Sequence, residues 1–235
     1  MRSFCPNCNR TLEWYELIPV LSFFIGGGKC ATCSQRISRT YPVVEFVAAA
    51  LTVLLFLRFG ATARFLFTVT FVLIMLLVAI VDWRHFLISN KILGLSFVLG
   101  VILFLAFNVN NLPQHLLSGV LAFGTMLTVT TMGKWIFRKE AMGFGDVKLG
   151  AVIGLFLGFQ NFLLAVWMAA VLGALFGIFK RVHQSSIFNL KSQINLPSLE
   201  IKLPFGTFMA ITSSVVCIFE EYVHEAIDLW LALMQ

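Results

Sequence analysis

Charged residues are scarce in this chain of 235 residues, and their scarcity excludes most classes of soluble protein. Asp, Glu, Lys and Arg make up 12% of the sequence, whereas hydrophobic residues make up 59% and the mean hydropathy is +0.92. A soluble domain carries about 25% charged residues. The apolar residues fall in long runs, and a helix needs about 17 to 25 of them to cross the hydrocarbon core. The composition therefore predicts a polytopic membrane protein.

Two further features are missing from the sequence. The first 41 residues contain no apolar core of the length that a cleavable signal peptide needs, so we expect none. No internal repeat and no low-complexity tract is visible. The chain is therefore interpreted as an ordinary polytopic protein whose spans must be found one by one.

The apolar runs predict an all-α protein with about seven transmembrane helices. The run at 149–159 is short for a span unless its helix begins near Asp146 or is partly re-entrant. A polar cytoplasmic loop is expected at about 180–202. We expect two domains, a cytoplasmic module at 1–41 and a membrane domain at 42–235. The predicted spans are 43–57, 65–81, 92–107, 116–137, 149–159, 161–179 and 203–219.

The basic residues predict the orientation of these spans, because cytoplasmic loops collect Lys and Arg. If the N-terminus is cytoplasmic, only Arg58 and Arg64 of the 17 Lys and Arg residues lie outside. The formal net charge of +6 then reflects membrane topology, and nucleic-acid binding is not expected. The same orientation places several acidic residues outside, namely Glu220, Glu221, Glu225 and Asp228.

Four of the five cysteines form two C-x-x-C pairs, Cys5 with Cys8 and Cys30 with Cys33. Their spacing is close to that of a zinc ribbon, in which two such pairs close a tetrahedral site of four thiolates. Redox pairs or disulfides are the alternative. A cytoplasmic location argues against disulfides, and two pairs argue against a single thioredoxin-like motif. The pattern favours structural Zn²⁺, while Cys217, inside an apolar span, is interpreted as a buried small hydrophobic residue.

Two carboxylates lie at the ends of predicted spans. Asp82 ends the second span, and Asp146 follows Gly143 and Gly145 in the string GFGD. The predicted topology puts both at the cytoplasmic face, where two carboxylates can share a proton, one acting as a base toward water and the other as an acid. The two glycines would let an extended substrate approach Asp146 closely. Each Asp could instead be a solvated cap at a helix end.

These motifs, in this order, resemble the type IV prepilin peptidase family, the leader peptidases of the GxGD class of membrane aspartic proteases. The resemblance covers nearly the whole chain, from the C-x-x-C pairs through ISRTYPVVE, VDWRHFLISNKI and GFGDVKLG to LPFGTF. It implies that Asp82 and Asp146 are the catalytic pair and that the four cysteines bind zinc.

The resemblance also implies a substrate and a location. Family members cleave the basic leader of type IV prepilins and pseudopilins after a glycine, at the cytoplasmic side of the bacterial inner membrane. Many also methylate the new N-terminal residue with S-adenosylmethionine. A basic leader followed by an apolar helix would present its junction at the depth of the two aspartates.

The sequence departs from the family pattern at several places. Members usually begin with one more hydrophobic helix, in the region to which the resemblance ties methylation. Ser89 and Thr207 stand where proline is usual, and neither is expected to contact a catalytic group. Glu45 is the acid to test for methylation, although it equally suits a charge at a helix N-terminus. Lys148 either tunes the aspartates or a substrate carboxyl, or snorkels to the interface.

Two other functions fit parts of the pattern. A small membrane transporter with a zinc-stabilised cap is one, but transporters place ionisable groups near the midplane between inverted repeats. A non-catalytic assembly factor that binds pilin helices in the same groove is the other. The four histidines are scattered along the chain, and none is interpreted as a ligand.

Overall fold

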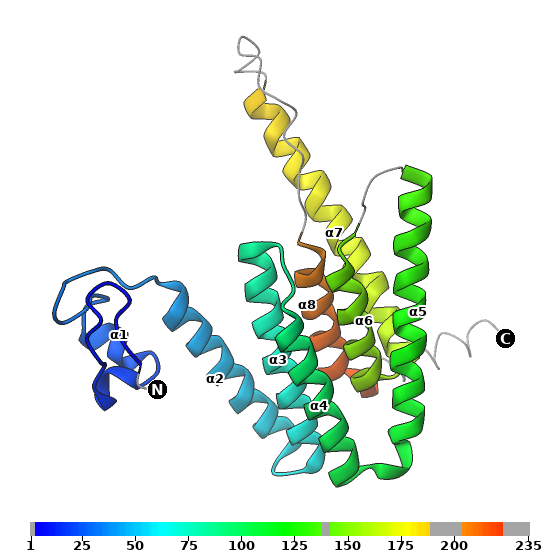
Figure 1. The fold of residues 1–235 in the computed structure, drawn as a ribbon, viewed down its shortest axis with the longest axis horizontal. Coiled ribbons are helices and arrows are strands. Elements are labelled where there is room, and N and C mark those ends of the chain that lie inside the picture. The colour runs from blue at the N-terminus through cyan, green and yellow to red at the C-terminus, as the bar shows by residue number, and fades with distance from the viewer. Residues whose placement is uncertain (1–2, 138–141, 189–203, 223–235) are drawn as a thin grey trace. The chain divides into compact units, whose positions relative to one another are not determined.

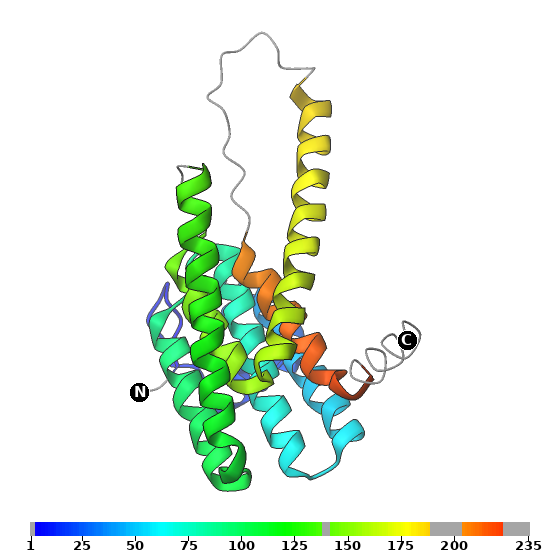
Figure 2. The ribbon, with the colours of Figure 1, turned by 90° about the vertical axis from the view of Figure 1, so that its right-hand side faces the viewer.

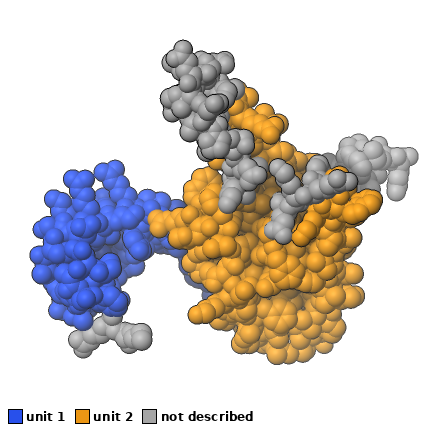
Figure 3. All heavy atoms as spheres, turned by 45° about the horizontal axis from the view of Figure 1, so that its top comes forward, with its two compact units in different colours: residues 1–65 blue, residues 66–235 orange. Residues whose placement is uncertain are grey.

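The computed structural model describes residues 3–137, 142–188 and 204–222, and every regular element in these ranges is a helix. The chain forms two compact units, residues 1–65 and 66–235 (Figure 3). The first unit therefore contains both the cysteine module and the first predicted span. The boundary that the sequence suggests at residue 41 stays a prediction.

The first unit consists of short turns around the cysteines, followed by one long helix. A 3₁₀ helix, η1 (Trp14–Leu17), and a short helix, α1 (Leu21–Ile25), separate the two cysteine pairs. The long helix, α2 (Thr40–Phe59), is apolar, and only 11% of its most hydrophobic window is buried. A helix that is apolar on all sides and so little covered by protein is suited to a lipid environment.

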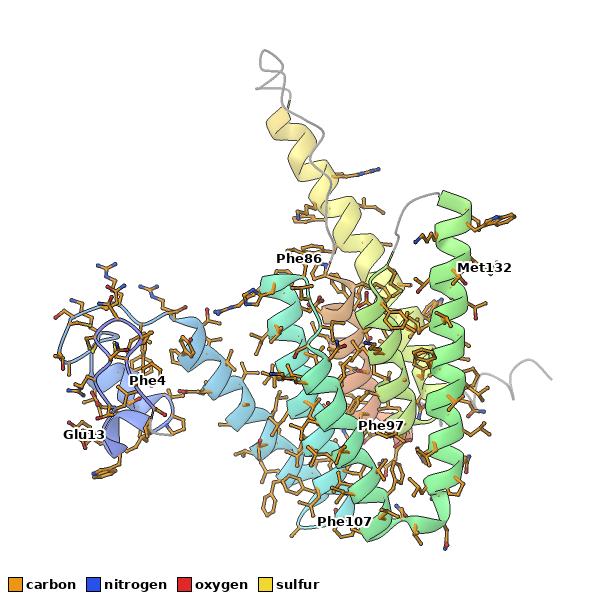
Figure 4. All side chains as sticks on the ribbon, in the orientation of Figure 1. Phe4, Glu13, Phe86, Phe97, Phe107 and Met132 are labelled. Carbon is orange, nitrogen blue, oxygen red and sulfur yellow. The ribbon has the colours of Figure 1, made fainter. Side chains whose placement is uncertain are left out.

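The second unit is a helical bundle with α6 at its centre (Figures 1 and 2). The short helix α6 packs against α4, α5, α7 and α8, and most of its residues are buried. Large apolar side chains such as Phe97, Phe107 and Met132 lie on the outside (Figure 4). The helices of this unit are α3 (Ala63–His85, which starts at the end of the first unit), α4 (Asn90–Phe107), η2 (Val109–Asn111), α5 (Leu112–Phe137), α6 (Phe144–Leu157), α7 (Phe159–Phe188) and α8 (Phe205–Ile218).

The fold class that the sequence predicts is confirmed. Within the described residues, five helices are long and apolar enough to cross a membrane, and α8 is a shorter apolar helix. Each of the seven predicted spans overlaps a helix. The run at 149–159 lies mostly in α6, which begins near Asp146, at Phe144, and ends at Leu157. The protein is therefore an all-helical, multi-pass membrane protein with a four-cysteine cluster near its N-terminus.

The cytoplasmic loop expected at about 180–202 stays a prediction, and its first residues continue helix α7. Helix α7 continues to Phe188, whereas the apolar run in its sequence ends at Phe179, before Lys180 and Arg181. Hydropathy marks where a chain leaves the hydrocarbon core, but Lys, Arg and Gln are good helix formers and extend the helix beyond it. Residues 189–202, the rest of the predicted loop, lie outside the described residues.

Close contact between α5 and α6 depends on small residues. An ideal Cβ placed on Gly154 would lie 2.5 Å from Ala122 Cβ and 2.8 Å from the carbonyl oxygen of Ser118. One turn earlier on α6, a Cβ on Gly150 would lie 2.7 Å from Met126 Cγ. Glycines four residues apart let two helix backbones approach each other, as in many membrane helix pairs. This contact fixes α6, which carries Asp146, against α5.

We expect Gly154→Ala to destabilise the protein by about 1–3 kcal/mol, because the added methyl overlaps backbone and side-chain atoms of α5. Gly124→Ala is the matched control, since nothing lies within 4 Å of a Cβ on that residue of α5. Thermal unfolding in detergent measures the difference. Equal unfolding temperatures for the two variants would contradict the packing argument.

Candidate functional site

The carboxylate of Asp82 is buried in the last turn of α3, where the start of α8 supplies its hydrogen-bond donors. The backbone N–H of Thr207 donates to Asp82 Oδ2 over 2.6 Å, and the Thr207 hydroxyl lies 2.9 Å from the same oxygen. The hydroxyl is also 3.2 Å from the carbonyl oxygen of Ala79. A free N–H at the start of a helix is a favourable partner for an anion. These contacts define Oδ2 as a hydrogen-bond acceptor.

Asp146 is buried in the first turn of α6, and its backbone N–H donates to the carbonyl oxygen of Gly143 over 3.1 Å. The first residues of α6 thus hold a second carboxylate at a helix N-terminus, where the helix dipole favours negative charge. Helix α6 packs against α4, α5, α7 and α8, and most of its residues are buried, so these neighbours position its first turn.

The two carboxylates converge on Gly206. An ideal Cβ on this glycine would lie 3.0 Å from Asp82 Oδ2 and 3.1 Å from Asp146 Oδ1. The two oxygens are therefore separated by no more than the sum of those distances. The structure brings together residues from α3, α6 and the start of α8, and any side chain at Gly206 would occupy the space between the acids.

Ile88 forms the apolar side of this site. Its Cδ1 would lie 2.8 Å from a Cβ on Gly206, and its Cβ would lie 3.0 Å from a Cβ on Gly145. Gly145 therefore lets α6 pack closely against the segment that follows α3. Gly143 is exposed. The prediction that these two glycines admit an extended substrate stays a prediction.

Lys148 lies one turn after Gly145 on α6 and points to the start of α4. Its Nζ donates to Asn90 Oδ1 over 2.9 Å and lies 5.0 Å from the centre of the Phe144 ring. The side chain is half-buried. These contacts tie α6 to α4, and a role in tuning the aspartates or binding a substrate carboxyl stays a prediction.

The expectation that Thr207 makes no contact with a candidate catalytic group is wrong. Its backbone amide and its hydroxyl both lie within hydrogen-bond distance of Asp82. A proline at this position would have neither group. Sequence reasoning also overlooked Gly206 and Ile88. The string LPFGTF was visible, but only the tertiary fold brings residue 207 next to residue 82.

The four cysteines of the two pairs form a separate cluster in the first unit. Their Sγ atoms all lie within 4.8 Å of one another, and the pairs Cys5–Cys33 and Cys8–Cys30 are each 3.9 Å apart. Ligands on a tetrahedron with metal–sulfur distances of about 2.3 Å are about 3.8 Å apart. The cluster therefore has the dimensions of a metal site.

The backbone around the cysteines also suits a metal site. Each pair forms a tight turn in which the amide of its first cysteine bonds a carbonyl five residues later, Arg10 in one turn and Gln35 in the other. Hydrogen bonds from the backbone amides of Cys33 and Thr32 lower the pKa of Cys30 to about 6. The thiolate is the form that binds metals.

Glu45 lies in the second turn of α2, where its carboxylate accepts a hydrogen bond from the backbone N–H of Val20 over 2.9 Å. The residue is otherwise exposed. Val20 has a φ of +64°, a strained conformation for a β-branched residue. The carboxylate thus fastens the cysteine module to the start of α2.

An all-helical membrane protein with two buried carboxylates converging from different helices, and a four-cysteine cluster ahead of its spans, belongs to a recognisable class. Residues 1–59 match the bacterial peptidase A24 N-terminal domain, and residues 69–178 match the type IV leader peptidase family. The chain belongs to the type IV prepilin leader peptidase family. No solved structure matches it.

Several curated relatives carry the name prepilin leader peptidase/N-methyltransferase. The relative from Bacillus subtilis (strain 168) is 36% identical over 176 residues, which cover 75% of this chain and 69% of the relative. That from Aeromonas salmonicida (strain A449) is 30% identical and covers 93% of this chain and 71% of the relative. That from Pseudomonas putida is 28% identical over 94% of this chain and 73% of the relative.

Proposed function

We propose that this protein is a prepilin leader peptidase of the bacterial inner membrane and that Asp82 and Asp146 are its catalytic pair. The observation that carries the proposal is the convergence of the two buried carboxylates on Gly206 in a chain of this family. Its substrates would be type IV prepilins or pseudopilins, cut at the cytoplasmic face where a basic leader meets an apolar helix. The relatives' names support this substrate class.

The hydrogen bonds divide the roles of the two acids. Asp82 Oδ2 accepts a hydrogen bond from the backbone N–H of Thr207, and we assign Asp82 the role of the base. Asp146 then carries the proton that the pair shares, because two ionised carboxylates so close together would repel each other. The asymmetry is built into the fold: both acids lie close to Gly206, but Thr207, the next residue of α8, donates its backbone N–H to Asp82.

The reaction follows from these roles. Asp82 takes a proton from water as the water oxygen attacks the scissile carbonyl carbon, and Asp146 gives its proton to the carbonyl oxygen. The tetrahedral intermediate then collapses. One of its hydroxyls returns a proton to Asp146, the C–N bond breaks, and the leaving amine takes the proton held by Asp82. Both carboxyls end in their starting protonation states.

Methylation of the new N-terminus with S-adenosylmethionine is a second activity that the relatives' names support. Glu45 is the acid in this chain that we would test for it. Its carboxylate bonds the backbone of Val20, so replacing it would also loosen the cysteine module. Glu45→Gln keeps a hydrogen-bond acceptor at that position and therefore separates a chemical role from a structural one.

Asp82→Asn and Asp146→Asn should each abolish leader cleavage, a loss of at least roughly 100- to 10,000-fold, because each removes one partner of the proton transfers. Purified protein is incubated with a synthetic prepilin, with and without S-adenosylmethionine, and mass spectrometry reports cleavage and methylation together. Glu220→Gln, which removes a carboxylate beyond the opposite end of α8, should retain cleavage. Cleavage by both Asn variants would refute the proposal that Asp82 and Asp146 are the catalytic pair.

Thr207→Val should lower kcat by roughly 10- to 100-fold with little change in KM, because a hydrogen bond to a charged group contributes about 1.5–3 kcal/mol. Thr207→Ser should restore the rate. The matched control is Thr212→Val, which removes another buried hydroxyl of α8 that bonds the Ala165 carbonyl instead. An unchanged kcat in Thr207→Val, or no rescue by serine, would contradict the role given to this residue.

We further propose that Cys5, Cys8, Cys30 and Cys33 hold one structural Zn²⁺. The metal would link the two turns of a module whose helices η1 and α1 contain no buried residue. Elemental analysis of the purified chain should find about one zinc per protein. Cys30→Ser should lose it, whereas Cys217→Ala should keep it. A stable, metal-free protein would exclude this site.

A further inference from the structure

The segment between the two cysteine pairs exposes an unusual amount of apolar surface. Trp14, Phe24 and Ile25 are 75%, 72% and 83% exposed, and Tyr15, Leu17 and Leu21 are each more than half exposed. Helices η1 and α1, which carry these residues, have no buried residue of their own. We call residues 14–25 the apolar segment. Contiguous exposed apolar surface of this kind marks a site of contact with something else.

The apolar segment is fastened beside the end of a membrane span. Val20, at its middle, donates its backbone N–H to Glu45 in the second turn of α2, so the segment lies beside the first turns of that helix (Figure 1). Helix α2 is a membrane span whose side chains are themselves little covered by protein, with Tyr41 and Phe46 both more than 60% exposed. The apolar segment therefore continues the lipid-facing surface of α2.

The composition of the segment and its surroundings identifies lipid as the occupant. Trp and Tyr gather at membrane–water interfaces, where an apolar ring lies near the headgroups. Exposed Lys29 and Arg36 face each other across an antiparallel bridge in the second cysteine turn, and exposed Arg39 precedes α2. Basic side chains next to an apolar surface favour a bilayer that contains anionic lipids.

We propose that the apolar segment lies in the headgroup region of the membrane and docks the cysteine module onto the lipid surface. The hydrogen bond between Val20 and Glu45 holds the segment at the level where α2 enters the bilayer. The cysteine cluster is then kept at the membrane surface instead of extending into solution. This inference concerns lipid contact alone and does not depend on the peptidase reaction.

The fluorescence of Trp14 tests the proposal in the full chain reconstituted into nanodiscs. The difference between the parent protein and Trp14→Phe isolates the emission of this side chain. With phosphatidylcholine and phosphatidylglycerol, we expect lipids brominated near the headgroup end of the acyl chain to quench this emission strongly. Lipids brominated near the methyl end should quench it less, and aqueous acrylamide should have little effect.

The matched control places a tryptophan elsewhere on the same module. Gln35→Trp, made in the Trp14→Phe background, puts the ring on the second cysteine turn, outside the apolar segment and exposed. We expect its emission to be quenched by acrylamide and not by brominated lipid. Phe24→Asp should reduce the lipid quenching of Trp14, and replacing phosphatidylglycerol by phosphatidylcholine should do so as well.

Three results would overturn the proposal. Quenching of Trp14 by acrylamide but not by brominated lipid would place the segment in water. Protection from both quenchers would mean that protein, either another copy or a partner, covers it. Equal lipid quenching at Gln35→Trp would mean that the module touches the membrane with no preference for the apolar segment.

Discussion

Burial of two carboxylates at one point is the constraint around which the second unit is built. Removing a carboxylate from water costs several kcal/mol unless donors or a shared proton compensate. The start of α8 supplies donors to Asp82, and the first turn of α6 places Asp146 within reach of the same glycine. Helices α3, α6 and α8 must therefore pack closely at this point. Gly206 has no side chain, which leaves space for the two carboxylates between these helices.

The short helix α6 makes this meeting possible. Its 14 residues are about 21 Å long, less than the roughly 30 Å of a hydrocarbon core, and other helices cover it. Gly150 and Gly154 let α5 approach it closely, while Gly145 admits Ile88. A central helix fixed in this way holds its N-terminal acid in one position, which general acid–base chemistry requires.

The first unit is organised by different forces. The turns of its cysteine module enclose four sulfur atoms, and most of the large apolar side chains of residues 14–25 are exposed. A small module without a core depends on a metal or a surface for stability. The proposed zinc ion and the proposed lipid contact would both stabilise the module. Glu45 connects the module to α2, the helix that enters the membrane.

The sequence by itself determined the membrane class, the positions of the helices, the cysteine pairs and the two acids, because hydropathy and short motifs are local properties. It did not predict that helix α7 continues to Phe188 or that Thr207 contacts Asp82. Helix α7 continues beyond its apolar run because the polarity of a residue and its helix propensity are separate properties. Thr207, Gly206 and Ile88 reach the acids only through the packing of α3, α6 and α8, and contacts between residues far apart in the chain leave no local pattern from which to predict them.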